Sequence, residues 1–218
     1  MRLWIRDILW RVRRRGLVGT ILGAAKGIPR SVMRALYLRR EAYITYTDIS
    51  ALPPPAPGRD PTVRAFLATP ADLERLEEAV GPARCETFRR RMGNGQALVL
   101  GEADGRVVGY CALAFEPTYA RESDCVVPVG EGEAYGHGAF TLPEYRRRGV
   151  YAAMLDESTR VVRERGICRV YGAVSVANPA ARAALRRLRA RAAWAAGSIR
   201  VLGFTRHWQR ELKEGERL

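Results

Sequence analysis

The hexapeptide Arg146-Arg147-Arg148-Gly149-Val150-Tyr151 separates an apolar stretch that ends at Pro143 from an amphipathic run over residues 150–165. This pattern predicts a strand, a basic glycine turn and then a helix. The first N–H groups of a helix have no acceptor within it, and the aligned peptide dipoles add partial positive charge there. Because Gly149 lets the main chain approach a ligand and three arginines precede it, we expect this turn to bind a cofactor that carries a pyrophosphate.

The composition indicates a soluble globular protein with an uneven distribution of charge. The chain has 218 residues, of which 47% are hydrophobic and 28% charged, and its formal net charge is +14. Residues 1–50 contain eleven Lys or Arg against three Asp or Glu, so more than half of the excess lies in the first quarter. These values argue against disorder and allow one sizeable domain with an appendage.

Metal-binding and membrane-spanning patterns are absent from the sequence. The four cysteines form no C-x-x-C pair, and only two histidines are present, so we expect no metal site. No segment has the roughly 20 apolar residues that a membrane span needs. Asp7 and Arg11 interrupt the apolar core that a signal peptide requires. The expected location is the cytoplasm.

The first 61 residues differ in character from the rest of the chain. Residues 1–50 predict a basic, amphipathic helical extension, with apolar residues at helical spacing from Met1 to Val12 and a second helix starting at Ser31. Val32, Met33, Leu36 and Tyr37 would form the apolar stripe of that second helix. Residues 51–61 contain consecutive prolines and predict a linker.

Residues 62–218 predict one α+β domain. Its expected elements, in order from Thr62, are strand, helix, helix, three strands, helix, strand, helix and strand. The hairpin signal is Ala103-Asp104-Gly105 between two apolar runs, and residues 116–132 predict a loop. The strand over residues 134–142 and the strand over residues 168–176 flank the helix at 150–165, which predicts a parallel crossover at the glycine turn.

Two motifs in this domain resemble those of a known family. Phe140 to Tyr151, with Arg146, Gly149 and Tyr151 at the spacing Arg-x-x-Gly-x-Gly/Ala, resembles the acyl-coenzyme A motif of the GNAT acyltransferases. The stretch Ser175 to Ala181 resembles the following strand and Asn-containing helix start. The resemblance covers about residues 62–208 and implies a mixed, mainly antiparallel sheet flanked by helices.

The resemblance also implies a function and a cosubstrate. It implies an N-acyltransferase that moves an acyl group directly from acetyl-coenzyme A, or another acyl-coenzyme A, to an amine such as an amino sugar or a lipid-linked acceptor. The main-chain N–H groups of Arg148, Gly149, Val150 and Tyr151 would hold the pyrophosphate, while Arg146 and Arg147 add charge. Phe140 and Leu142 would offer main-chain hydrogen bonds to the pantetheine arm, and Asn178 would contact the same arm.

The chain departs from the family pattern at three places. Tyr151 stands where the family has Gly or Ala, so the helix start is bulkier. Leu185 occupies the position at which many members have a Tyr that protonates the leaving thiolate. Arg189-Ala190 replaces a Gly-Phe pair of the family. The alternative function is therefore a non-catalytic module that binds acyl-coenzyme A.

Acyl transfer needs a neutral amine, whereas an alkyl amine with a pKa of about 10 is mostly protonated at pH 7. A base must therefore remove a proton. His137, Tyr135 and Glu133 lie on one side of the strand before the motif, and His137 is the first candidate because its ordinary pKa is close to neutrality. Glu133 is the second candidate, acting through water past Tyr135; either residue could instead be structural.

The sequence allows several binding partners for residues 1–50. Trp4, Trp10 and the arginines suit a peripheral contact with the inner membrane surface, while packing on the domain or in a homodimer is the alternative. Nucleic acid ranks last because no aromatic and basic reading motif is present. The expected acceptor is a small molecule or a glycan.

Overall fold

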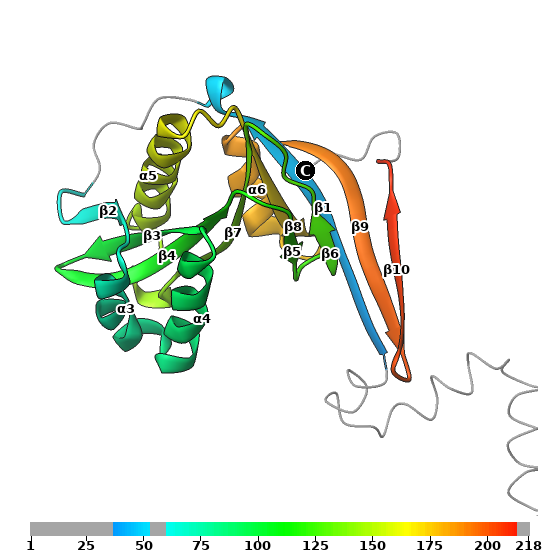
Figure 1. Cartoon of the computed structure of the whole chain (residues 1–218), viewed down its shortest axis with the longest axis horizontal. Coiled ribbons are helices and arrows are strands. Elements are labelled where there is room, and N and C mark those ends of the chain that lie inside the picture. Colours follow the sequence, from blue (N-terminus) through cyan, green and yellow to red (C-terminus); the bar gives the residue numbers. More distant parts are fainter. Residues whose placement is uncertain (1–36, 53–59, 213–218) are drawn as a thin grey trace, which may run out of the picture. The chain divides into compact units, whose positions relative to one another are not determined.

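The computed structural model describes residues 37–52 and 60–212. These residues form an eight-stranded sheet in the order β10-β9-β1-β8-β7-β4-β3-β2 (Figure 1). In chain order its strands are β1 (Tyr37–Asp48), β2 (Val63–Leu67), β3 (Ala97–Ala103), β4 (Arg106–Ala114), β7 (Glu133–Thr141), β8 (Arg169–Ser175), β9 (Arg191–Val201) and β10 (Phe204–Arg210). The α-helices are α3 (Leu73–Val80), α4 (Pro82–Gly93), α5 (Val150–Glu164) and α6 (Pro179–Arg187), and the hairpin β5 (Thr118–Ala120) and β6 (Cys125–Val127) makes a separate small sheet.

The prediction of an α+β fold with a mixed, mainly antiparallel sheet is confirmed. β2 pairs with β3, β3 with β4, β4 with β7 and β1 with β8, all antiparallel. β7 and β8 are parallel, as expected for two strands joined through helix α5.

Helices cover both faces of the sheet because its strands alternate apolar side chains. Leu98 and Leu100 of β3 pack with α3 and α4 on one face. Val99 of the same strand packs with Val150 and Met154 of α5 on the other face. Figure 1 shows α5 on the opposite side of β3 and β4 from α3 and α4.

The strands β1 and β8 are covered by different elements. Tyr43 and Val174 pack with the apolar side of α6. Ile44 lies on the other face, in a cluster with Ala120 and Val127 of the β5–β6 hairpin. The hairpin therefore occupies the α4 face of the sheet, and α6 occupies the α5 face.

The helical extension predicted for residues 1–50 is not found where the chain is described. Residues Tyr37–Asp48 form strand β1, whose residues Ala42 to Asp48 pair with Ser175 to Arg169 of β8. Alternating Tyr, Ile and Thr residues favour an extended strand once a partner is present. The expected helices before residue 37 lie outside the described residues.

Two further expectations differ from the structure. The stretch expected to be a loop over residues 116–132 contains the β5–β6 hairpin. Helix α6 ends at Arg187 and not near Arg191, because Arg189 adopts a left-handed φ of 54° that a helix cannot continue.

Contacts divide the described chain into two units, which are residues 40–197 with 207–212 and residues 37–39 with 198–206. The smaller unit contains the turn from β9 to β10, where Leu202 and Gly203 have φ values of 50° and 89°. Two consecutive positive φ values are typical of a two-residue hairpin turn. All of the site described below lies in the larger unit.

Candidate active site

The strands β7 and β8 separate in the middle of the sheet. Their parallel pairing runs from Glu133 opposite Arg169 to Gly136 opposite Gly172 and ends there, although both strands continue. A bulge in β7 lies directly after this point, because Tyr110 pairs with Phe140 whereas Ala112 pairs with His137. Gly138 provides the positive φ of 67° within the bulge. The two strands therefore form a V that opens toward the start of α5 (Figure 1).

The predicted glycine turn lies at the start of α5, as expected. Gly149 is the N-cap residue with φ 89°, and Val150 is the first helical residue. The Ala153 N–H donates to Gly149 O at 2.9 Å, so the N–H groups before it have no acceptor within the helix. A helix start of this kind is suited to a phosphate.

Two of the three arginines before the turn have different surroundings. Arg148 donates to Asp104 at 2.7 and 2.9 Å and lies 3.3 Å from Asp60, so its charge is compensated by carboxylates. Arg146 Nε donates to Thr141 O at 3.2 Å and lines the groove described next. Arg146 is therefore better placed than Arg148 to add side-chain charge at the turn.

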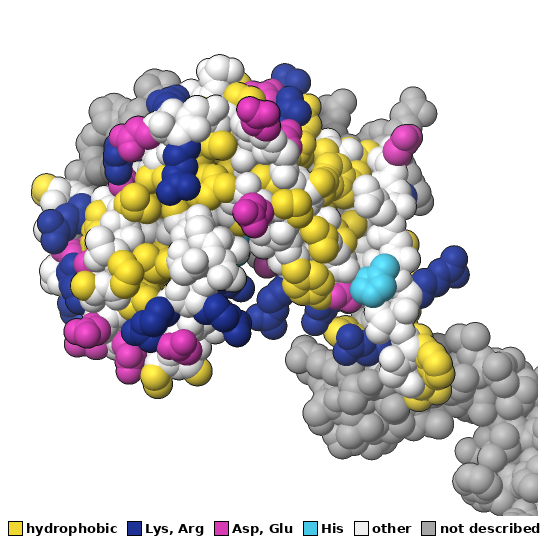
Figure 2. Space-filling model, viewed as in Figure 1, with side chains coloured by type: hydrophobic (Ala, Val, Ile, Leu, Met, Phe, Trp, Pro, Cys, Tyr) yellow, Lys and Arg dark blue, Asp and Glu magenta, His cyan; other side chains and the backbone are white. Residues whose placement is uncertain are grey.

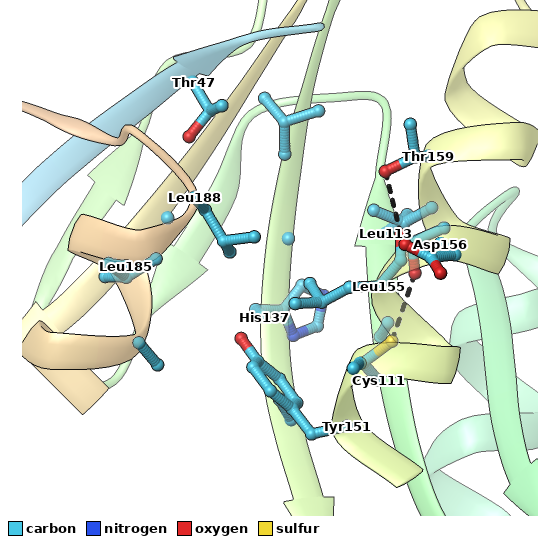
Figure 3. Close-up of a pocket in the computed structure, with 18 of the residues that line it drawn as sticks. Thr47, Cys111, Leu113, His137, Tyr151, Leu155, Asp156, Thr159, Leu185 and Leu188 are labelled. Carbon is cyan, nitrogen blue, oxygen red and sulfur yellow. Dashed lines mark hydrogen bonds between the residues drawn. The ribbon is translucent and has the colours of Figure 1, made fainter. Parts of the chain in front are cut away.

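A groove runs from this turn between α5 and α6 and over the V. It encloses about 1200 Å³. In Figure 3, Tyr151 and Leu155 of α5 lie across an open space from Leu185 of α6 and from Leu188, which directly follows that helix. His137 lies behind them on β7. Of the residues predicted for the site, the groove brings together Arg146, Tyr151, Phe140, His137 and Asn178.

The Tyr151 side chain points into this groove and not over the helix start, and its hydroxyl is directed toward the space beside α6 (Figure 3). Burial raises the pKa of Tyr151 to about 12. The hydroxyl therefore keeps its proton at neutral pH and can donate it.

His137 is half-buried at the V, and Gln96 holds its ring. Its Nε2 lies 3.2 Å from Gln96 Oε1, and its ring stacks on Tyr135 at 5.2 Å between centroids. Since an amide oxygen only accepts, Nε2 is the protonated nitrogen and Nδ1 keeps its lone pair. Burial and then the charge of Arg91 lower the pKa of His137 to about 4, so the ring is neutral at pH 7.

Glu133 and Tyr135 are placed differently from His137. Glu133 Oε1 accepts from Tyr171 OH at 3.1 Å and Oε2 from Gly130 N at 3.1 Å, at the closed end of the V. Tyr135 is 1% exposed, and burial raises its pKa far above neutrality. Both carboxylate oxygens of Glu133 therefore have structural partners.

The main-chain groups of β7 do not point as the sequence predicted. The Leu142 N–H donates to Val108 O at 2.9 Å, so it is not available to a ligand. Because main-chain groups alternate along a strand, Phe140 and Leu142 face β4, while those of Ala139 and Thr141 face the V. The expectation for Leu142 is wrong as to its N–H donor, because the bulge sets which residues face the open side.

Asn178 caps α6 with its Oδ1, which accepts from Ala181 N at 3.0 Å, and it lines the groove. Gln96 and Glu122 belong to the site but were not predicted. Gln96 follows α4 and belongs to no motif. Glu122 lies between β5 and β6 and lines the groove. The described residues contain no group of three His, Cys, Asp or Glu side chains that could hold a metal ion.

Comparison with known proteins identifies the family of the chain. A model described as the acetyltransferase (GNAT) family matches residues 64–189, more than half of the chain. The chain belongs to the GNAT acetyltransferase family. Members of this family use an acyl-coenzyme A, typically acetyl-coenzyme A, as the cosubstrate.

Solved GNAT structures share the fold. A GNAT-family structure from Novosphingobium aromaticivorans aligns with 73% of this chain at 18% identity and a TM-score of 0.51, and the match covers 63% of that protein. A GCN5-related N-acetyltransferase from Sphaerobacter thermophilus aligns with 84% of this chain at 20% identity and a TM-score of 0.51. The match covers 57% of the second protein, so the chain spans less than two thirds of both. The comparison with curated proteins finds no match. Among the helices that the structure describes, none has the length and apolar character to cross a membrane.

Proposed function

We propose that this GNAT protein transfers an acyl group directly from acyl-coenzyme A, most simply acetyl-coenzyme A, to an amine. The observation that carries the proposal is the V between β7 and β8, with the start of α5 at its open end and His137 at its apex. The α5 start binds the pyrophosphate, and the groove leads from there to His137. A long, narrow cosubstrate such as acyl-coenzyme A fits along that path.

The residues at the open end would hold the coenzyme. The N–H groups of Gly149, Val150 and Tyr151, together with the first turn of α5, bind the pyrophosphate, and Arg146 adds a positive charge. Ala139 and Thr141 offer main-chain groups to the pantetheine arm from β7. Asn178 contributes its Nδ2 amino group from the other side, since its Oδ1 is used in the helix cap.

His137 is the proposed base for the acceptor. The amine nitrogen attacks the thioester carbon, its proton passes to His137 Nδ1 directly or through water, and the carbon–sulfur bond breaks. A main-chain N–H of the bulge at Gly138, where the β4–β7 ladder is interrupted, stabilises the oxyanion. We assign Glu133 and Tyr135 to positioning, because Glu133 is held by Tyr171 and Tyr135 stacks on His137.

Tyr151 is the proposed proton donor to the leaving thiolate. The family position for such a tyrosine is Leu185 in this chain, which lies across the groove from Tyr151 (Figure 3). The Tyr151 hydroxyl is protonated at neutral pH and faces the same space. A tyrosine from α5 thus supplies the group that α6 lacks.

Thiol release from acetyl-coenzyme A, followed with a panel of amines, tests the function. Amine-dependent release is expected, and His137→Gln should lower kcat by about 100-fold. His207→Gln is the matched control, because His207 is the other histidine of the chain and contacts Asp124 O away from the groove. Tight coenzyme binding without turnover of any amine would instead favour the non-catalytic module.

The proposed acceptor and the basic first 36 residues together favour a location for the enzyme in the cell. An amino sugar or a lipid-linked amine suits a cytoplasmic enzyme that docks on the inner membrane surface through its basic N-terminal region. Flotation on anionic vesicles, compared between the full chain and a chain lacking residues 1–36, tests this docking. Equal flotation of the two forms would contradict it.

A further inference from the structure

Three arginines lie near one another on the face of the sheet that carries α4 and the β5–β6 hairpin. Arg84 and Arg91 lie seven residues apart on α4 and therefore share one face of that helix, and Arg121 follows β5. We call Arg84, Arg91 and Arg121 the arginine cluster. Figure 2 shows dark blue side chains gathered on the surface between α4 and the β5–β6 hairpin.

Direct contacts join the arginine cluster to the site. Arg84 Nη1 donates to Tyr110 OH at 2.5 Å, and Tyr110 stacks on Phe140 at 5.5 Å between centroids. The Arg91 carbonyl accepts from Gln96 N at 3.1 Å, and Gln96 holds His137. The cluster therefore adjoins the strand and the imidazole that would face an acceptor.

Among the residues that the structure describes, no carboxylate forms an ion pair with the cluster. Within residues 37–52 and 60–212, several arginines form ion pairs with carboxylates, as Arg89 does with Glu86 at 2.6 Å. No ion pair within these residues involves a member of the cluster. Burial lowers the pKa of Arg91, and the charges of Arg90, Arg121 and Arg84 lower it further, while Tyr110 acts in the opposite direction. The acid nearest in sequence, Glu122, is exposed beside Arg121.

A half-buried guanidinium among other cations is stabilised when an anion is present. Arginine also binds phosphate and carboxylate groups through two parallel hydrogen bonds. The C-terminal end of α4 compensates Arg91 in part, since helix dipoles favour cations there, but this does not apply to Arg84 in the first turn. The geometry therefore favours an external anion.

We propose that the acceptor amine carries a phosphate or a carboxylate, which the arginine cluster binds beside His137. This inference rests on the proposed acyl transfer to an amine. The main chain of Arg91 accepts from Gln96 N, and the Gln96 side chain holds His137, so this part of the cluster lies close to the imidazole. An acceptor that reaches both therefore carries its anionic group close to its amine.

Binding of the anion has a measurable effect on His137. Three residues act on His137: Gln96 contacts its Nε2, Tyr135 of the same strand stacks on its ring, and the charge of Arg91 lowers its pKa. Glu122 lines the same groove as His137. An anion at Arg91 offsets the one positive charge that opposes protonation of the imidazole, so bound phosphate moves the His137 resonances.

Histidine NMR of the full chain tests the site without needing turnover. The protein is saturated with coenzyme A to fill the pyrophosphate site and is then titrated with inorganic phosphate; His207→Gln assigns the two histidines. We expect a saturable shift of His137 that Arg91→Gln removes and Arg89→Gln retains. The absence of a saturable shift, or an equal shift in Arg91→Gln, would overturn the anion site.

Paired acceptors then identify the anion. Phosphoethanolamine is compared with ethanolamine, and alanine with alaninamide. A charge-assisted hydrogen bond corresponds to about 10- to 100-fold in kcat/KM, which we expect for one anionic member and mainly in KM. The preference should fall below about threefold in Arg91→Gln and persist in Arg89→Gln.

Two other outcomes have separate meanings. Equal turnover of anionic and neutral acceptors would overturn the inference and leave the acyl transfer standing. A phosphate-dependent shift of His137 without turnover of any amine would support the anion site and count against the proposed transfer.

Discussion

His137 Nε2 lies 3.2 Å from Gln96 Oε1, so a side chain 41 positions earlier holds the imidazole at the V. Burial, followed by the charge of Arg91, keeps the pKa of this ring at about 4, below its ordinary 6.5. The unfolded chain takes up this proton near pH 6.5, whereas the folded chain does so only near pH 4. Between these values the unfolded state binds more protons, and stability therefore falls as the pH is lowered.

The first prediction concerns this pH dependence. One pKa unit corresponds to about 1.4 kcal/mol, so His137 should cost about 2 to 3 kcal/mol of unfolding free energy between pH 6.5 and pH 4.5. Urea unfolding at several pH values measures it. His137→Gln should flatten this part of the profile, and His207→Gln should not. Parallel profiles for the wild type and His137→Gln would show that the ring is not buried in its neutral form.

The second prediction compares two glycines of the sheet. A Cβ on Gly109 would lie 2.8 Å from Phe140 O, whereas a Cβ on Gly136 would lie at least 3.6 Å from any other heavy atom outside its chain neighbours. Because main chain cannot yield as a flexible side chain does, Gly109→Ala should cost about 1 to 3 kcal/mol of stability. Gly136→Ala should leave stability nearly unchanged in urea unfolding. The same loss for both variants would contradict the close approach of β4 to β7.

The third prediction concerns Tyr151. If its hydroxyl protonates the leaving thiolate, Tyr151→Phe should lower kcat by on the order of a hundredfold and leave the KM for acyl-coenzyme A nearly unchanged. Tyr145→Phe is the control, because Tyr145 packs beside Val150 outside the groove. Thiol release at saturating acyl-coenzyme A measures the effect. An unchanged kcat in Tyr151→Phe would assign this proton to water.

Local signals in the sequence were sufficient to predict the turn and helix start that we propose to hold the cofactor. Gly149 and the apolar face of α5 predicted a strand, a turn and a helix, because each depends on neighbours within one or two turns. The helix start capped by Asn178 was predicted in the same way, from the sequence Asn178-Pro179.

Long-range pairing could not be predicted. Strand β1 finds its partner about 120 residues later, with Asp48 opposite Arg169, and nothing in Tyr37–Asp48 identifies that partner. The bulge at Gly138 shifts the register by one residue, which exchanges the faces of all following main-chain groups and explains the difference at Leu142. Gln96 and the arginine cluster reach the site only through tertiary packing.

The central claim is that the groove between α5 and α6 binds acyl-coenzyme A. Calorimetric titration of the full chain with coenzyme A tests this claim most directly. The variant Ala152→Trp places an indole in the groove, and the control variant Ala83→Trp places one on the exposed side of α4. One-to-one binding is predicted for the wild type and Ala83→Trp, with at least about tenfold weaker binding for Ala152→Trp. Absence of binding, or equal affinity in all three proteins, would contradict the account.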